Sequence, residues 1–215
     1  MTSSEENYIK VIYHLSVASS KGVSTNAIAE ELKTKASSVT DMIKKLSDKN
    51  FISHQKYYGV TLTEKGKKEA KMIVRKHRLW EVFLVEKLGF SWDEVHDIAE
   101  ELEHIKSEKL TNKLDAYLGF PMTDPHGDPI PDEKGKIQPI VKSLLSEVAI
   151  QTPFLCVGVK DSSAVFLQYL NKQKITLGSQ IKVLEKESFD DSFVIELDGK
   201  ILTISNKIAT NLYVQ

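Results

Sequence analysis

The sequence predicts a mainly helical protein that ends in a small β domain, and three observations support this prediction. Apolar residues recur at helical spacing through most of the first 118 residues. Five of the six prolines then fall between residues 121 and 139, where regular structure should stop. Beyond residue 140, short runs alternate apolar and polar residues, which is the period of strands. We therefore expect three domains, over residues 1–63, 64–139 and 140–215.

The composition is that of a globular protein of two or three small domains. The chain has 215 residues, of which 41% are hydrophobic and 27% charged. No apolar run is long enough for a membrane helix, and the polar, acidic N-terminus argues against a signal peptide. The one cysteine, Cys156, excludes an internal disulfide framework and lies in a strand-like run where packing is its expected role. We expect a cytoplasmic protein with no membrane partner.

The net charge of −1 conceals a strong asymmetry along the chain. Residues 33–78 hold 13 basic and 4 acidic side chains, which gives +9. Residues 79–160 hold 8 basic and 15 acidic side chains, which gives −7. A basic segment beside an acidic one suggests an anionic partner at the first and a cation at the second, although solvated helix surfaces give the same pattern.

The first domain has the element order of a winged helix-turn-helix. An amphipathic helix is followed by a short helix that Ser24 can cap, then by a third helix and two strands around a turn at 57–59. The expected elements are helices over 4–19, 26–33 and 37–49 and strands over 51–53 and 60–62.

In such a module the third helix enters the major groove of DNA. Hydroxyl groups near its start can bond to bases or phosphates, and lysines neutralise phosphates. The alternative is a helical hairpin used for protein contacts, but the basic run that begins at Lys65 favours DNA. The expected DNA-binding residues are Lys35, Ser37, Ser38, Thr40, Asp41 and Lys44, with Tyr57 of the hairpin beside the backbone.

The second domain should contain three consecutive helices. A long helical pattern covers 64–88, and a capping box of Ser91 and Glu94 starts a helix that we expect to run to about residue 107. A further helix is expected over 108–118. Large apolar side chains on all three exceed what one small domain needs, which suggests a dimer interface.

The helix expected after Ser91 carries an unusual stripe of potential metal ligands. At 100° per residue, His96, Glu100, Glu103 and His104 lie on one face. Imidazole nitrogen and carboxylate oxygen without thiolate suit Mn(II), Fe(II) or Zn(II). Each residue taken singly is more often solvated surface, but the cluster favours a metal. A second pair, His77 and Glu81, lies one turn apart on the preceding helix.

Residues 119–139 are expected to form an extended linker between domains, because proline and glycine interrupt them repeatedly. A proline-stiffened loop can present Asp124 and His126 as ligands, although plain solvent exposure is the commoner state of a loop histidine. Beyond it, several short strands, a helix over 164–171 and an Asp198-Gly199 hairpin turn suggest a small SH3-like barrel.

Several motifs in order resemble the diphtheria toxin repressor and manganese transport regulator family of metal-dependent repressors. The match covers essentially the whole chain, and the last part resembles the ferrous-transport-protein-A-like domain of longer members. The resemblance implies a repressor that binds double-stranded operator DNA as a homodimer when loaded with metal and controls metal-uptake genes. The motifs are strongest over 36–46, 58–66, 76–79, 94–96 with 102–104, and 126–131.

The resemblance also implies the ligand sets. One regulatory site would join the first helix to the ligand stripe, a second would use the pair on the long helix, and the linker and last domain would add further ligands. These sets are Asn7, Glu100, Glu103 and His104; His77, Glu81 and His96; and Asp124, His126 and Asp161.

Three positions bear on the choice of metal. Asn7 lies where the family often has Asp or Met, and Lys10 lies where members with two closely spaced manganese ions have Glu. Glu100 replaces the cysteine of iron-selective members. An oxygen-rich site favours Mn(II), with Fe(II) as the alternative and Zn(II) as an ion bound in vitro.

Two other functions remain to be weighed. A metallohydrolase can use a similar cluster, but the sequence has no HExxH motif and no separate general base that stands out. A winged-helix regulator with an organic effector would leave the clustered ligands without a purpose. We therefore expect a regulator and not an enzyme.

Overall fold

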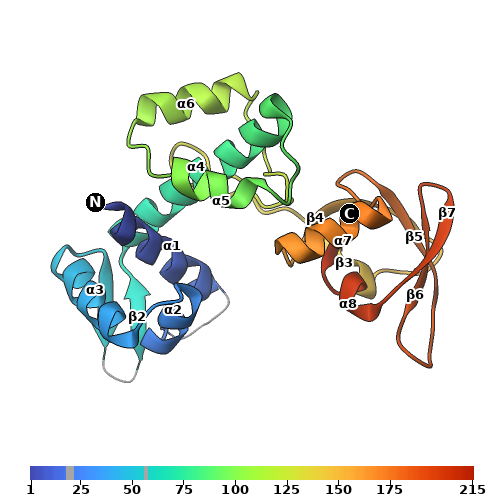
Figure 1. Cartoon of the computed structure of the whole chain (residues 1–215), viewed down its shortest axis with the longest axis horizontal. Helices are drawn as coiled ribbons and strands as arrows, with labels where there is room; N and C mark the ends of the chain where they lie inside the picture. The colour runs from blue at the N-terminus through green and yellow to red at the C-terminus, as the bar shows by residue number, and fades with distance from the viewer. Residues whose placement is uncertain (18–21, 56–57) are drawn as a thin grey trace. The chain divides into compact units, whose positions relative to one another are not determined.

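The computed structural model describes residues 1–17, 22–55 and 58–215, which fold into two compact units (Figure 1). Each unit contains its own hydrophobic core. The first unit consists of Met1–His77, Glu100–Lys109 and Pro131–Lys136. The second unit consists of Arg78–Ala99, Leu110–Ile130 and Ile137–Gln215.

The N-terminal part of the first unit has the predicted order of elements. Ser24 caps the second helix, because its hydroxyl accepts the Ala27 N–H at 3.1 Å. The two strands pair antiparallel, with Ile52 opposite Leu62. The turn expected at 57–59 lies partly outside the described residues. The elements are α1 (Ser3–Val17), α2 (Thr25–Glu31), α3 (Ala36–Asp48), β1 (Ile52–Gln55) and β2 (Gly59–Leu62).

The core of this module joins α1 to α3. Ile9 and Ile12 of α1 are fully buried in the same cluster as Val39 and Leu46 of α3. Burial of such a side chain contributes about 1.5–3 kcal/mol. A restraint applied to α1 is therefore transmitted to α3 through tightly packed side chains.

An ion-pair cluster adds to this core at the start of α1. Glu5 is fully buried, and its Oε1 accepts hydrogen bonds from Lys49 Nζ at 2.7 Å and Lys45 Nζ at 3.0 Å. The hydrogen bond from Lys49 is the main reason that the pKa of Glu5 falls to about 2, and Lys45 adds to it against the opposing effect of burial.

The Glu5→Gln variant is expected to be less stable than the natural chain at neutral pH by about 1 kcal/mol, because both lysines are about half exposed and solvent screens them. A lowered pKa stabilises the fold above pH 4.5, the ordinary value, and this contribution is lost as the pH falls through 2. Urea unfolding at several pH values tests the prediction. A stability difference that persists unchanged down to pH 2 would contradict it.

Three further helices follow the winged module: α4 (Glu64–Leu88), α5 (Val95–Leu102) and α6 (Glu108–Tyr117). The bounds predicted for α4 and α6 are confirmed to within a residue, but α5 ends at Leu102 and not near residue 107. The Ile105 N–H bonds back to the Leu102 carbonyl in a tight turn. The ligand stripe therefore does not lie on one straight helix, because Glu103 and His104 follow the end of α5.

The part of the proline-rich segment over residues 123–129 forms a tight loop, where an extended linker was expected. Asp124 Oδ1 accepts the N–H groups of His126 and Asp128 at 2.8 and 3.0 Å, which closes a tight loop. Thr123 and Pro129 form an isolated antiparallel bridge across the base of this loop. Side-chain acceptors thus replace the regular hydrogen bonds that the prolines prevent.

The last part of the second unit is an antiparallel six-stranded sheet with a helix, α7 (Ala164–Gln173), and two helical turns, η1 (Leu145–Glu147) and α8 (Asn206–Ala209). The strand order is β3-β8-β4-β5-β6-β7. The strands are β3 (Ser143–Leu144), β4 (Pro153–Val159), β5 (Gln180–Lys186), β6 (Phe193–Leu197), β7 (Lys200–Ile204) and β8 (Leu212–Val214).

The predicted details of this domain are confirmed. Asp198 and Gly199 both have positive φ and join β6 to β7, as a two-residue hairpin requires. Cys156 is buried in the core, and burial raises the pKa of its thiol to about 11. The fold class is that predicted, a helical protein with a C-terminal β domain. None of the described helices is long and apolar enough to cross a membrane.

Candidate metal centres and DNA-binding surface

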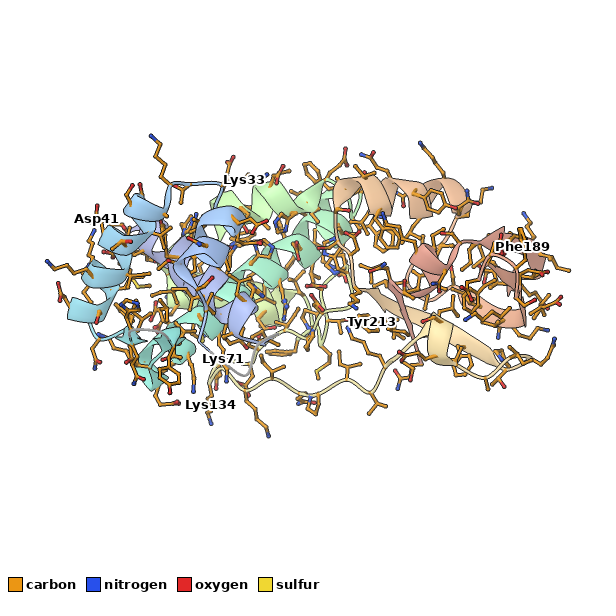
Figure 2. All side chains as sticks on the ribbon, turned by 90° about the horizontal axis from the view of Figure 1, so that it is seen from below. Lys33, Asp41, Lys71, Lys134, Phe189 and Tyr213 are labelled. Carbon is orange, nitrogen blue, oxygen red and sulfur yellow. The ribbon has the colours of Figure 1, made fainter. Side chains whose placement is uncertain are left out.

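Helix α3 presents its polar residues to solvent. The residues expected to bind DNA on or next to α3 are all exposed, while Val39, Ile43 and Leu46 between them are buried. Figure 2 shows Asp41 projecting outward from α3 and Lys33 from the turn before it. Tyr57 lies outside the described residues. This division of α3 leaves one face free for a partner. The exposed residues are Lys35, Ser37, Ser38, Thr40, Asp41 and Lys44.

A hollow of about 300 Å³ lies beside this face. Thr40, Lys44 and Asp48 of α3, Thr25 of α2 and His54 of β1 are among the residues that line it. Hydroxyl, ammonium and imidazole groups are hydrogen-bond donors that suit phosphate oxygen. His54 was not among the expected residues, because nothing in the sequence distinguishes it from other exposed strand residues.

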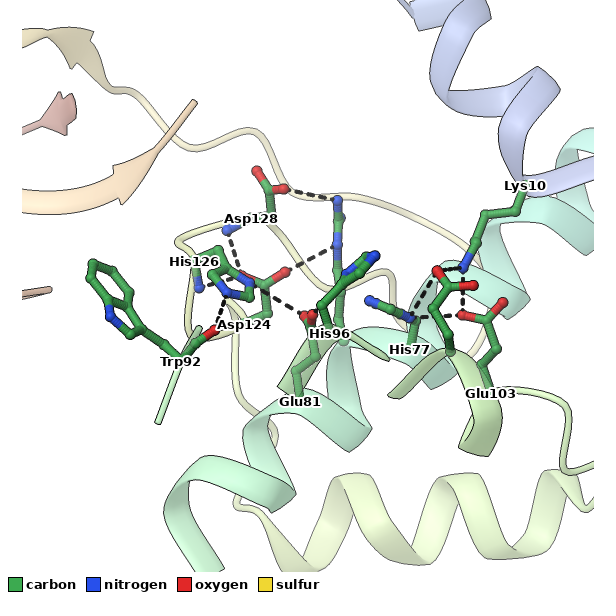
Figure 3. Close-up of polar contacts among 11 residues, drawn as sticks. Lys10, His77, Glu81, Trp92, His96, Glu103, Asp124, His126 and Asp128 are labelled. Carbon is green, nitrogen blue, oxygen red and sulfur yellow. Dashed lines mark hydrogen bonds and ion pairs between the residues drawn. The ribbon is translucent and has the colours of Figure 1, made fainter. Parts of the chain in front are cut away.

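The first ligand cluster lies in the first unit and contains His77, Glu100 and Glu103 (Figure 3). One donor atom from each lies within 4.8 Å of the others. His77 Nδ1 is 2.7 Å from Glu103 Oε2, and the Lys10 ammonium donates to the same oxygen at 2.7 Å and also to Glu100. Helices α1, α4 and α5 and the turn after α5 thus contribute to one polar cluster.

Burial and charge oppose each other at Glu103, which is fully buried. Burial would raise the pKa of its carboxyl, but the hydrogen bond from His77 and the charge of Lys10 outweigh this effect, so the pKa is lowered. Glu103 Oε1 and Asn7 Oδ1 are buried oxygens without a hydrogen-bond partner among the described residues. The unpartnered oxygen of Glu103, in a cluster with Glu100 and His77, fits a divalent ion.

His104 has a different neighbour from the one expected. Its Nδ1 lies 2.7 Å from Oε2 of the buried Glu6, and the described clusters of three donors do not include it. A carboxylate on one ring nitrogen is the usual way to orient a histidine whose other nitrogen binds metal. No sequence pattern pointed to Glu6, because its burial depends on the packing of α1.

The second ligand cluster lies in the second unit and contains Glu81, Asp124 and His126, all three buried. Their donor atoms lie within 4.8 Å of one another, and Glu81 Oε2 is 3.6 Å from His126 Nδ1. Burial, followed by the negative charge of Glu81, raises the pKa of Asp124 to about 6. Two neighbouring buried carboxylates repel each other, and a cation relieves that repulsion.

His126 is held by a backbone contact. Its Nε2 lies 2.8 Å from the Trp92 carbonyl oxygen, which can only accept, so Nε2 carries the proton. In the neutral ring the lone pair is then on Nδ1, the nitrogen that faces Glu81. Burial alone would lower the pKa of His126, but Glu81 and Asp124 outweigh it and raise the pKa to about 9. The Trp92 contact fixes the orientation of the ring, and a metal ion bound at Nδ1 would displace the proton that the raised pKa keeps there.

Arg78 anchors the loop that carries these ligands. Its Nε lies 3.3 Å from Asp124, a terminal nitrogen lies 3.3 Å from Asp128, and another donates to the Pro129 carbonyl. Arg78 therefore fixes the loop and offsets part of its negative charge.

Two other expected ligands, His96 and Asp161, are not members of the second cluster. His96 Nδ1 is 3.6 Å from Glu81 Oε1, although its side chain is more than half exposed. Asp161 is half-buried, and its Oδ1 accepts the Ser163 N–H at 2.9 Å. The predicted set of His77, Glu81 and His96 divides between the units, since His77 belongs to the first. The ligand roles of His96 and Asp161, and the grouping of His77 with Glu81 and His96, stay predictions.

A winged helix with a free polar face, combined with buried clusters of carboxylates and imidazoles, defines a metal-responsive DNA-binding protein. The family model described as "Iron dependent repressor, N-terminal DNA binding domain" matches residues 1–60. "Iron dependent repressor, metal binding and dimerisation domain" matches 63–132, and "FeoA domain" matches 144–215. The chain belongs to the iron-dependent repressor family of transcriptional regulators.

Relatives of known structure or name support this membership. The transcriptional regulator MntR of Oceanobacillus iheyensis is 42% identical over 120 residues, which is 55% of this chain and 80% of that protein. A manganese-dependent transcriptional repressor solved in complex with manganese is 35% identical over 98% of both chains, with a TM-score of 0.87. The manganese regulator SloR is 33% identical over 100% of this chain and 99% of that one, with a TM-score of 0.75.

Proposed function

We propose that this chain is a repressor that binds operator DNA as a homodimer in the cytoplasm when its ligand clusters hold Mn(II), and that it controls metal-uptake genes. The observation that carries the proposal is that α1 belongs both to the core beneath α3 and to the cluster of Glu100 and Glu103. The three-domain division into 1–63, 64–139 and 140–215 is part of this proposal.

The linkage between the cluster and DNA follows from the packing of α1. A divalent ion supplies a positive charge and directed bonds that hold carboxylate, amide and imidazole donors in one geometry. Asn7 lies on α1, and Glu100 and Glu103 lie at the end of α5 and just after it. Holding these residues together restrains α1, and the shared core passes the restraint to α3. DNA and metal then strengthen each other's binding by the same factor.

Mn(II) is the ion that the donors favour, with Fe(II) as the alternative and Zn(II) as an ion bound in vitro. Both clusters consist of carboxylate oxygens and imidazole nitrogens without a thiolate. The related repressor solved with manganese supports this choice.

Exposed apolar side chains support the homodimer. Leu110 and Tyr117 of α6 are 41% and 66% exposed, and Phe120 and Met122 directly after it are 66% and 52% exposed. Such a group of large apolar residues on one short stretch is typical of an interface. A two-fold dimer would place its α3 helices to reach half-sites about 34 Å apart or a multiple of that distance.

A gel-shift titration tests the proposal on duplexes that the Mn(II)-loaded protein selects from a random pool. We expect EDTA to weaken binding by roughly 10- to 100-fold and Mn(II) to restore it. Separate titrations with Mn(II), Fe(II) and Zn(II) then rank the ions. The Lys44→Ala variant, changed on the exposed face of α3, should bind weakly in every condition. Equal affinity of the natural chain with and without metal would contradict the proposal.

A further inference from the structure

Lys10 is a buried lysine placed directly on the oxygens of the first ligand cluster. It is only 7% exposed, and its ammonium contacts Glu100 Oε1 and, at 2.7 Å, Glu103 Oε2. Taking an ammonium out of water costs several kcal/mol unless carboxylates compensate for it. The two glutamates supply that compensation, so the lysine and the cluster stabilise each other in the metal-free chain.

The same contacts conflict with metal binding. An ion bonded to Glu103 Oε2 and Glu100 Oε1 competes for the two oxygens that now accept hydrogen bonds from Lys10. It would also lie beside a positive charge in a poorly solvated place, where repulsion is strong. His77 adds no charge when neutral, so Lys10 and the two glutamates together have a net charge of −1. Without the lysine the same group has a net charge of −2.

We propose that Lys10 is an internal cation that occupies the first ligand cluster in the metal-free chain and leaves it when an ion binds. This inference rests on the proposed metal site at Glu100 and Glu103. Lys10 then determines the threshold of the site, because an ion that takes Glu100 Oε1 and Glu103 Oε2 must displace an ammonium. Its four-carbon stem permits the displacement without movement of α1.

The exchange also changes what metal does to the winged helix. In the metal-free chain, Lys10 already joins α1 to Glu100 and Glu103. Metal binding therefore replaces the connection through Lys10 by a connection through the ion, and it does not create the first connection between α1 and the two glutamates. Asn7 of α1 can take part in the connection through the ion. Specificity for a divalent ion follows, since a monovalent ion offers no more charge than the lysine that it would displace.

The decisive experiment compares Mn(II) binding by the Lys10→Met variant with binding by the chain that keeps Lys10. Electron paramagnetic resonance measures the free Mn(II) that remains in each titration. Both chains carry Glu81→Gln, so that the second cluster contributes little. Methionine keeps the stem and removes the charge. We expect Lys10→Met to bind Mn(II) at least about tenfold more tightly. Lys106→Met is the matched control, because Lys106 is exposed and bonds only to the Met1 carbonyl among the contacts described.

A second readout follows the metal-free state. In EDTA, backbone amides around Glu103 should exchange hydrogen faster in Lys10→Met than in the natural chain, and Mn(II) should remove the difference. Lys10→Gln, which keeps a donor for the carboxylates, provides the comparison if Lys10→Met folds poorly, and it should also bind Mn(II) more tightly.

The outcomes separate this inference from the proposed function. Binding that depends on Glu103 but is no tighter in Lys10→Met or Lys10→Gln than in Lys106→Met overturns the role of Lys10 and leaves the metal site intact. If Glu103→Gln removes no Mn(II) binding in either background, the proposed metal site is wrong. The exchange with Lys10 is then wrong as well.

Discussion

The Glu103→Gln variant is expected to lose the whole metal-dependent gain in operator affinity, roughly 10- to 100-fold at saturating Mn(II). Glutamine has the same shape but no charge, and Glu103 is fully buried with one oxygen shared by Lys10 and His77. The other oxygen has no hydrogen-bond partner among the residues that the structure describes. Gel-shift titration with and without EDTA measures the loss.

The control for this variant is Glu101→Gln, two residues earlier on α5 and exposed to solvent. It removes the same charge without touching the cluster, so its metal response should be that of the natural chain. Circular dichroism should give the same helix content for both variants. Full metal stimulation in Glu103→Gln would show that Glu103 does not bind the ion.

The Gly127→Ala variant is expected to lower the free energy of unfolding by roughly 3 to 5 kcal/mol. Gly127 has φ of +82°, and a Cβ atom there would lie 2.0 Å from the Val157 carbonyl oxygen and 2.4 Å from the Gly158 Cα. These are backbone atoms of β4, which cannot move away cheaply. The loop that carries Asp124 and His126 must shift, so Mn(II) binding by the second cluster should weaken as well. Urea unfolding and Mn(II) titration measure the two effects.

Gly119→Ala separates backbone strain from the clash. Gly119 has φ of +77°, but a Cβ atom there would meet nothing within 4 Å. Its cost should be that of the left-handed conformation alone, about 1 kcal/mol. Equal losses of stability in the two variants would mean that the approach of Gly127 to β4 is unimportant.

The sequence predicted the helices and strands well where local pattern decides them. Ser24 caps α2 as expected, α4 has the predicted bounds, and the Asp198-Gly199 turn joins β6 to β7. The same reasoning was wrong about the end of α5. Apolar and acidic residues continue at helical spacing to residue 104, but the chain turns after Leu102. No glycine or proline marks that turn, so local pattern could not locate it.

The ligand clusters were predictable in residue type but less so in grouping. Helical spacing selected Glu100 and Glu103, but it could not place His77 beside them. Nor could it show that Lys10 lies on the same oxygens, since these residues are some 90 positions apart. The proline-stiffened loop and the resemblance to known repressors both suggested Asp124 and His126, and the structure places both beside Glu81.

The sequence alone determined the class of this protein, because periodicity, capping residues and the types of metal-binding side chain are local properties. Each can be recognised from a short stretch of the chain. Only the tertiary structure decided which donors share a cluster and which cation faces them. Distances between side chains on different helices depend on packing, which places Glu103 in a dry interior beside Lys10 and His77. In that interior charges interact far more strongly than in water, so these few contacts decide how the site responds to metal.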